Sequence, residues 1–260
     1  MARWIVALLI AIASLAAYFG TTSENPITGE TQRVALKPDE EIALGLKSAP
    51  EMAAQMGGLS RNPQARALVE RVGATLARES IAAKSPYRFG FHVLADPRTI
   101  NAFALPGGPV FFTEGLLRQL KTEGELAGVL GHEIGHVIAR HSSERLAKQQ
   151  LTQGLLSALV VGSGDYNAAQ IGQLVGSMIN MKYGREDELE SDALGVRIAA
   201  EAGYDPRAMV RVMEVLAKAS SGSRQPEFFS THPAPENRGA KIQEAIQKQF
   251  PSGVPAGLKR

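Results

Sequence analysis

The sequence predicts an α+β protein that is predominantly helical, with a small antiparallel sheet beside a histidine-rich helix. Apolar residues recur at helical spacing along most of the chain and alternate at strand spacing only within residues 87–113. The third observation is "GHEIGHVIARH" at residues 131–141, which holds three of the five histidines. The 260 residues are 44% hydrophobic and 21% charged, which suits one globular domain with appendages.

Composition and charge exclude several classes of function. The chain has no cysteine, so a disulfide scaffold, a thiolate zinc site, a cysteine nucleophile and a lipid-anchoring cysteine are all excluded. The formal net charge is +2, and no block of basic residues occurs. We therefore expect no nucleic-acid partner.

Residues 1–20 predict a signal peptide or an N-terminal membrane anchor. One arginine precedes an uncharged apolar run from Trp4 to Phe19, which is slightly short for a comfortable membrane span. A short cationic start followed by an apolar run is typical of a secretory leader. In both interpretations, the domain is exported or is held at a membrane through residues 4–19. Residues 21–37 are polar, contain glycine and proline, and predict a linker.

Residues 38–250 are expected to form the folded domain, with a C-terminal tail over residues 251–260. Helices should begin at Pro38 and Pro63, because proline suits the first turn of a helix. The alternating segment 87–94 predicts a strand, and "INAFALPGGPVFFT" at 100–113 predicts a strand, a turn and a strand. The chain then becomes helical again, with expected segments at 122–150, 151–183 (a helical hairpin), 186–202, 206–219 and 236–249.

His132, Glu133 and His136 predict a metal site on the histidine-rich helix. Two imidazoles at positions i and i+4 lie on one helix face, so both can bind one ion. Neutral imidazole suits zinc, and the intervening glutamate can take a proton from metal-activated water. His141 lies about 140° round a continuous helix from His136 and is not expected to share the ion.

A catalytic zinc usually has three protein ligands, so an acid must supply the third. The densest acidic segment is "YGREDELESDALGV" at residues 183–196. Glu188 and Asp192 are spaced i, i+4 on one face, so one could bind the metal while the other holds a ligand histidine. Glu186 and Glu190 have the same spacing, so helix geometry alone does not choose between the two pairs.

Four motifs in this order resemble metallopeptidase family 48, which includes HtpX-like, CAAX prenyl protease-like and BepA-like enzymes. The resemblance covers roughly residues 38 to 250, and we expect a stand-alone periplasmic member without a tandem-repeat domain. Ser191 stands where alanine is more usual in the family. The motifs are "NAFALPGG" (101–108), "ELAGVLGHEIGHVIARH" (125–141), "ELESD" (188–192) and "THPAPENR" (231–238).

The resemblance implies a fold, a ligand set and roles for further residues. The fold would be a gluzincin-like zincin domain holding one zinc ion per chain. Glu188 would be the third ligand, Asp192 would orient His132, and His232 would be a regulatory ligand that holds the enzyme latent. An edge strand above the metal would pair with the substrate backbone, and its residues would be Asn101, Ala102, Phe103, Gly107 and Gly108.

The expected function is a zinc endopeptidase with Glu133 as the catalytic base and Asp192 in support. The leader and the resemblance imply a bacterial periplasmic enzyme, either free or anchored in the membrane by its N-terminal segment. It would cleave misfolded or unassembled envelope proteins, including outer-membrane proteins. The alternative is a zinc-stabilised, chaperone-like binding protein without turnover. No oxyanion donor can be named, although Arg185 and Arg238 lie near the motifs.

Overall fold

The computed structural model describes residues 1–164, 183–220, 226–233 and 237–260. Residues 165–182, which include most of the second half of the hairpin expected over 151–183, lie outside the described residues. The chain divides into two compact units. The first unit comprises Met1–Lys37 and Arg140–Tyr183, and the second comprises Pro38–Ala139 and Gly184–Arg260.

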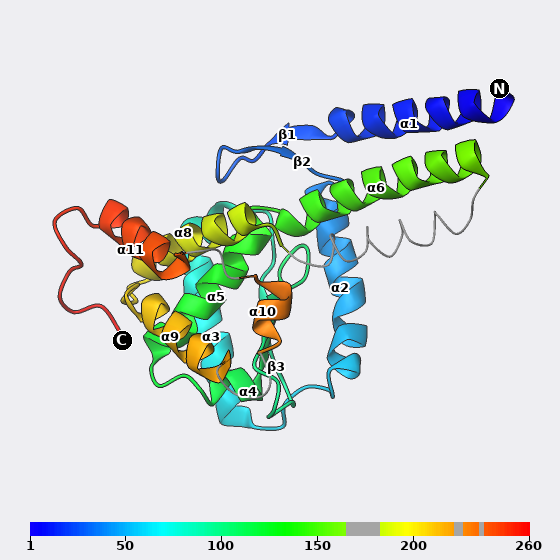
Figure 1. Ribbon diagram of the computed structural model, residues 1–260. Helices are drawn as coiled ribbons and strands as arrows, with labels where there is room; N and C mark the ends of the chain where they lie inside the picture. Colours follow the sequence, from blue (N-terminus) through cyan, green and yellow to red (C-terminus); the bar gives the residue numbers. More distant parts are fainter. Residues whose placement is uncertain (165–182, 221–225, 234–236) are drawn as a thin grey trace. The chain divides into compact units, whose positions relative to one another are not determined.

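In the first unit, helix α1 (Ala2–Gly20) lies beside helix α6 (His141–Ser163) (Figure 1). Two short antiparallel strands, β1 (Thr22–Glu24) and β2 (Thr31–Arg33), fill much of the segment that the sequence predicts as a linker. The turn between them is closed by Asn25, whose side-chain oxygen accepts hydrogen bonds from two backbone N–H groups. Local turn chemistry therefore gives this segment a regular structure that its polar composition conceals.

The second unit holds most of the helices and the larger sheet. The helices expected from Pro38 and Pro63 are both present, and Asn62 caps the second with its side-chain oxygen. The described helices of this unit are α2 (Pro38–Gln55), α3 (Pro63–Glu79), η1 (Ile81–Lys84), α4 (Glu114–Leu117), α5 (Glu123–Ile138), α8 (Arg185–Glu201), α9 (Ala208–Ser220), α10 (Phe228–Thr231) and α11 (Arg238–Gln249).

The larger sheet has the strand order β3-β5-β4, with β3 at Gly90–Leu94, β4 at Ala102–Ala104 and β5 at Pro109–Thr113. The pairing of β4 with β5 is antiparallel, as predicted, but β3 and β5 are parallel, so the sheet is mixed. The reason is that the chain adds β4 as an edge strand before it returns through the centre as β5. Periodicity along one strand carries no information about which neighbour it pairs with.

Helix α5 is the centre of the second unit and packs against α3, α8 and α9 (Figure 1). Every residue from Gly124 to Ile138 is buried, so this helix has no solvated face. The helix expected over 122–150 is two helices, because Arg140 adopts a left-handed conformation with φ 62° and ends the run. No glycine or proline marks that break in the sequence.

Glycines allow α5 and α8 to approach closely. A β-carbon on Gly195 of α8 would lie 2.9 Å from the backbone nitrogen of His132, and one on Gly131 would lie 3.1 Å from the carbonyl oxygen of Gly195. Both neighbours are backbone atoms, which cannot move aside without shifting a helix. The close approach brings the residues of the two helices within reach of one another.

Gly195→Ala is expected to lower the free energy of unfolding by about 1–3 kcal/mol, because the added methyl group overpacks the α5–α8 contact. Gly239→Ala in α11 is the matched control, since a β-carbon there meets open space. It should be neutral or should stabilise by up to about 1 kcal/mol through better helix propensity. Urea denaturation compares the two variants, and equal stability of Gly195→Ala and the wild type would contradict the packing argument.

The end of the chain is held against the second unit. The backbone N–H of Asp205 donates to the Lys259 carbonyl at 2.8 Å, and the N–H of Lys259 donates to the Gly203 carbonyl at 3.0 Å. Residues 251–260, expected as a tail, therefore contribute backbone pairing to the turn after α8. The boundaries predicted at residues 20, 37 and 250 stay predictions.

Candidate metal centre

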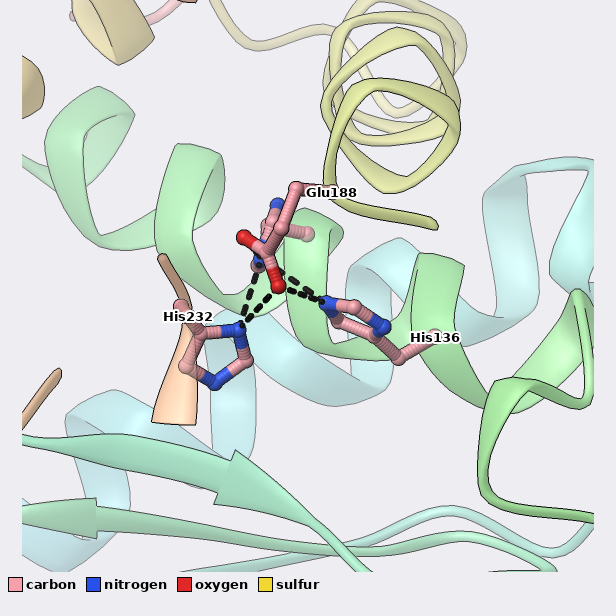
Figure 2. Close-up of side chains that lie close together, drawn as sticks. His136, Glu188 and His232 are labelled. Carbon is pink, nitrogen blue, oxygen red and sulfur yellow. Dashed lines mark hydrogen bonds and ion pairs between the residues drawn. The ribbon is translucent and has the colours of Figure 1, made fainter. Parts of the chain in front are cut away.

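Four buried side chains from three segments converge on one point. Helix α5 supplies His132 and His136, α8 supplies Glu188, and the segment after α10 supplies His232. Their ligand atoms all lie within 4.8 Å of one another. Figure 2 shows the side chains of His136, Glu188 and His232 pointing toward a common position.

Several distances between these atoms are close to those between the ligands of one metal ion. Nε2 of His132 lies 3.0 Å from Nε2 of His136 and 3.3 Å from Nδ1 of His232. Oε1 of Glu188 lies 3.0 Å from Nδ1 of His232 and 3.4 Å from Nε2 of His136. A tetrahedron with metal–ligand distances of about 2.0–2.1 Å has edges of about 3.3–3.4 Å. Four of the six distances between the ligand atoms are therefore close to this value, and all six are within 4.8 Å.

Glu133 lies beside this group with its carboxylate buried. In the described part of the chain, neither carboxylate oxygen has a hydrogen-bond partner. Oε1 lies 3.6 Å from Nε2 of His232. Burial raises the pKa of the Glu133 carboxyl above its ordinary value, although the nearby histidines oppose the shift. A buried carboxylate without hydrogen bonds is costly, so the surroundings of Glu133 fit a site in which a metal ion or its water would be the partner.

Asp192 holds the opposite side of the His132 ring. Its Oδ1 atom lies 2.9 Å from Nδ1 of His132, which leaves Nε2 directed at the common position. Such a carboxylate fixes the tautomer and the orientation of a ligand imidazole. Burial alone would raise the pKa of Asp192, but the Arg238 guanidinium and His132 outweigh it and hold the pKa below its usual value.

Arg238, at the start of α11, is the functional residue whose role the sequence did not reveal. Its Nε and Nη2 atoms donate to Asp192 at 2.7 and 2.8 Å, and Nη2 lies 3.1 Å from Oε2 of Glu188. A buried pair of acids needs a cation. The prediction that Glu188 and Asp192 are both buried could therefore have indicated a nearby arginine or lysine. Two of its nitrogens are engaged by acids, while Nη1 is buried without a hydrogen-bond partner among the described residues. Arg185 is exposed at the start of α8.

Glu188 is ionised in this environment. Burial works against the charge, but hydrogen bonds to His136 and His232, together with the nearby imidazoles, lower the pKa of Glu188 well below its usual value. The other acid pair considered from the sequence lies elsewhere, because Glu186 is exposed and Glu190 is half-buried. Burial therefore distinguishes the two pairs that share the same spacing.

The remaining histidines lie outside the metal group. His141 is the buried first residue of α6, and its ring centroid lies 6.2 Å from that of Tyr183. His92 lies on β3, where its ring packs against Phe111 at 5.1 Å. The expectation that His141 does not share the ion with His132 and His136 stays a prediction.

Strand β4 is an edge strand of the sheet that contacts α5. In its pairing with β5, the hydrogen bonds fall at residues 101, 103 and 105. The backbone groups of Ala102 and Ala104 therefore point away from β5, since antiparallel pairs alternate. This is the edge that an extended peptide would need.

The two glycines of the turn after β4 are fixed by close contacts. Gly107 and Gly108 have φ angles of 77° and 130°. A β-carbon on Gly107 would lie 2.4 Å from Cα of Ile42, and one on Gly108 would lie 2.4 Å from the Arg88 carbonyl oxygen. These positions exclude other residues because of backbone conformation and space. They support the shape of the turn, and their part in substrate binding stays a prediction.

Comparisons with known proteins agree with this geometry. Residues 63–246 match the family model of peptidase family M48. The beta-barrel assembly-enhancing protease of Escherichia coli (strain K12) is 29% identical, over 96% of this chain and 53% of the relative. The Yersinia pestis protein of that name is 31% identical, over 82% of this chain and 45% of the relative.

A third relative comes from a eukaryote. The mitochondrial metalloendopeptidase OMA1 of Schizosaccharomyces pombe is 34% identical, over 64% of this chain and 49% of the relative. The chain thus spans about half the length of the curated relatives it matches. The family model covers most of the chain, including all of α5 and α8 and the described segment with His232. The chain therefore belongs to peptidase family M48.

Proposed function

We propose that this chain is a zinc-dependent endopeptidase with one zinc ion bound by His132, His136 and Glu188. The observation that carries the proposal is the convergence of buried nitrogen and oxygen ligand atoms within 4.8 Å of one another. The buried Glu133 carboxylate beside them has no hydrogen-bond partner among the described residues. Imidazole and carboxylate ligands in this number suit zinc. Membership of family M48 supports the same chemistry.

The side chains around the site have distinct tasks in peptide hydrolysis. When bound, zinc would act as a Lewis acid: it would make water lose a proton more readily, so that the water can attack, and it would polarise the substrate carbonyl. Glu133 accepts the proton of the attacking water, and its raised pKa brings it closer to the operating pH. Asp192 holds the Nδ1–H of His132, and Arg238 holds Asp192 in place. The free edge of β4 aligns the substrate backbone.

His232 would be a fourth ligand that holds the enzyme latent. Its Nδ1 atom is placed like the three other ligand atoms, and the side chain is fully buried. A catalytic zinc keeps one position open for water, whereas four protein ligands close the site. Displacement of the segment that bears His232 would therefore open the site for hydrolysis.

His232→Ala is expected to raise the rate of peptide hydrolysis, because the variant frees the fourth position. The rate of cleavage of an unfolded protein, followed by gel densitometry at equal zinc content, measures the effect. His92→Ala is the control, since that residue lies on β3 away from the group. A rate that stays unchanged in every condition tried removes His232 from the proposed regulation.

The proposed substrates are misfolded or unassembled proteins of the cell envelope, outer-membrane proteins among them. Two relatives are named beta-barrel assembly-enhancing proteases, which supports substrates of this class. Pairing through the backbone of β4 would suit unfolded chains, since it makes little demand on sequence. The apolar helix α1 supports export across a bacterial inner membrane to the periplasm, with or without an anchor.

A second candidate function is a zinc-stabilised, chaperone-like protein that binds unfolded chains without cutting them. The observation in its favour is the fourth ligand, because four protein ligands are usual in structural zinc sites. The buried carboxylate of Glu133, which has no hydrogen-bond partner among the described residues, argues against it, since binding alone gives no reason to bury that group.

Metal removal distinguishes the two functions. Treatment with a chelator should abolish cleavage of an unfolded protein, and one equivalent of zinc should restore it, while the fold is monitored by circular dichroism. A wild-type chain and a His232→Ala variant that both load one zinc, bind unfolded protein and never cleave it would support the binding function and refute the peptidase.

A further inference from the structure

The first unit presents an unusually apolar surface on α1. The helix has 19 residues and is about 28 Å long at 1.5 Å per residue, close to the ~30 Å hydrocarbon core of a bilayer. Within the described residues it is the one helix long and apolar enough to cross a membrane. Only Ala7 is buried on it. Its large exposed apolar side chains are Trp4, Ile5, Val6, Leu8, Leu9, Ile12, Leu15 and Phe19.

Helix α6 packs along α1 through small residues. A β-carbon on Gly154 would lie 2.1 Å from Oγ of Ser14, and one on Gly162 would lie 2.7 Å from the Trp4 ring. The later residue of α6 meets the earlier residue of α1, so the helices are antiparallel. Ala158, one turn from each glycine, is buried. Small residues at four-residue spacing allow close approach of helices, as in membrane helix pairs.

The outward side of α6 suits lipid as well. From Gly154 to Ser163 the exposed residues are Leu155, Leu159 and two serines, and no residue there is charged. The exposed glutamines Gln149, Gln150 and Gln153 lie toward the start of the helix, beside the end of α1 that carries Tyr18 and Phe19. The hydroxyls of Thr152, Ser157 and Ser163 each donate to the carbonyl four residues earlier at 2.8 Å. These polar groups are satisfied within their own helix and do not require water, which is the condition for facing hydrocarbon.

Charge is confined to the two ends of the pair. Arg3 lies against the end of α6, since a β-carbon on Gly164 would meet its guanidinium at 2.8 Å. At the other end, the Arg33 guanidinium lies 5.3 Å from the Tyr18 ring centroid and 5.0 Å from that of Phe19. Arginine and aromatic residues at both ends, with an uncharged surface between them, complement the headgroup and acyl layers of a bilayer.

We infer that α1 is retained in the mature protein and forms a lipid-embedded pair with residues 154–163 of α6. A cleaved leader would leave the small-residue face of α6 without the helix that covers it. A lone anchor would give no reason for the second helix to be apolar on its outward side. The occupant of this surface is the acyl region of a phospholipid bilayer. This inference is independent of the proposed zinc chemistry.

Tryptophan fluorescence tests the inference, because Trp4 is the only tryptophan in the chain. The full chain with Trp4→Phe and Leu159→Trp is reconstituted in phosphatidylethanolamine and phosphatidylglycerol vesicles containing phosphatidylcholine brominated on its acyl chains. We expect the tryptophan at position 159 to lose most of its fluorescence. The matched control is Trp4→Phe with Leu46→Trp on α2, where the exposed leucine lies outside the pair. It should keep its fluorescence.

Two results would overturn the inference. If position 159, and a Leu155→Trp version made to guard against local misfolding, are not quenched while Trp4 in the unaltered chain is, then α6 is not in lipid. A second copy of the chain covering α6 would give that same result. If the protein isolated from native membranes lacks residues 1–20 by mass spectrometry, α1 is not retained.

Discussion

Glu133→Gln is expected to abolish peptide hydrolysis while leaving the metal bound. Loss of a general base typically lowers the rate by about 10²–10⁴-fold. The variant keeps the shape of a side chain that is fully buried and contributes no ligand atom to the metal group. Zinc content should therefore stay at one per chain while cleavage falls below detection.

The measurement is cleavage of an unfolded protein alongside zinc content by mass spectrometry. Glu123→Gln is the control on the same helix, because that carboxylate is partly exposed and pairs with Arg71 at the surface. An exposed ion pair contributes little to stability, so this control should cleave at the wild-type rate. A Glu133→Gln protein that keeps its zinc and cleaves as fast as the wild type would refute the mechanism.

Arg238→Met is expected to be among the most destabilising single changes in the second unit. The guanidinium is buried against Asp192 and Glu188, so its removal leaves two buried acids without their cation. Removing one partner of a buried ion pair typically costs about 3–5 kcal/mol. Zinc affinity should also fall by about 10–100-fold, because Asp192 no longer holds His132 in place.

Urea denaturation and competition with a zinc chelator measure the two effects. The double variant Arg238→Met, Asp192→Asn should recover part of the stability, since it removes one of the unpaired charges. It should not recover zinc affinity. Arg78→Met, at an exposed surface ion pair, is the control. An Arg238→Met protein with wild-type stability and zinc affinity would show that the buried ion pairs do not support the site.

The sequence predicts the two histidine ligands of the metal site well, but its spacing alone does not identify the glutamate ligand. The spacing of His132 and His136 determines a shared helix face, and the structure places their Nε2 atoms 3.0 Å apart. The third ligand needed the family pattern, because two acid pairs on the same helix have equal spacing. What separates Glu188 from Glu186 is burial against α5, which depends on how the helices pack and not on either helix alone.

Other features depend on contacts that no local pattern encodes. The break at Arg140 has no glycine or proline to signal it. The parallel pairing of β3 with β5 follows from the strand order in the sheet, in which β5 lies between β3 and β4. Arg238 lies 46 residues beyond Asp192 in the chain, yet its guanidinium donates a hydrogen bond to that carboxylate. Turn chemistry, in contrast, was readable, since Gly107 and Gly108 lie in the expected turn between β4 and β5.

The most direct test of the account is anomalous X-ray scattering at the zinc absorption edge from crystals of the full chain. We predict one zinc peak within bonding distance of His132, His136 and Glu188, with Nδ1 of His232 as the fourth ligand. Crystals of Glu133→Gln should show the same peak. A zinc peak bound elsewhere, or no peak in a protein that still cleaves unfolded chains, would contradict the proposed centre.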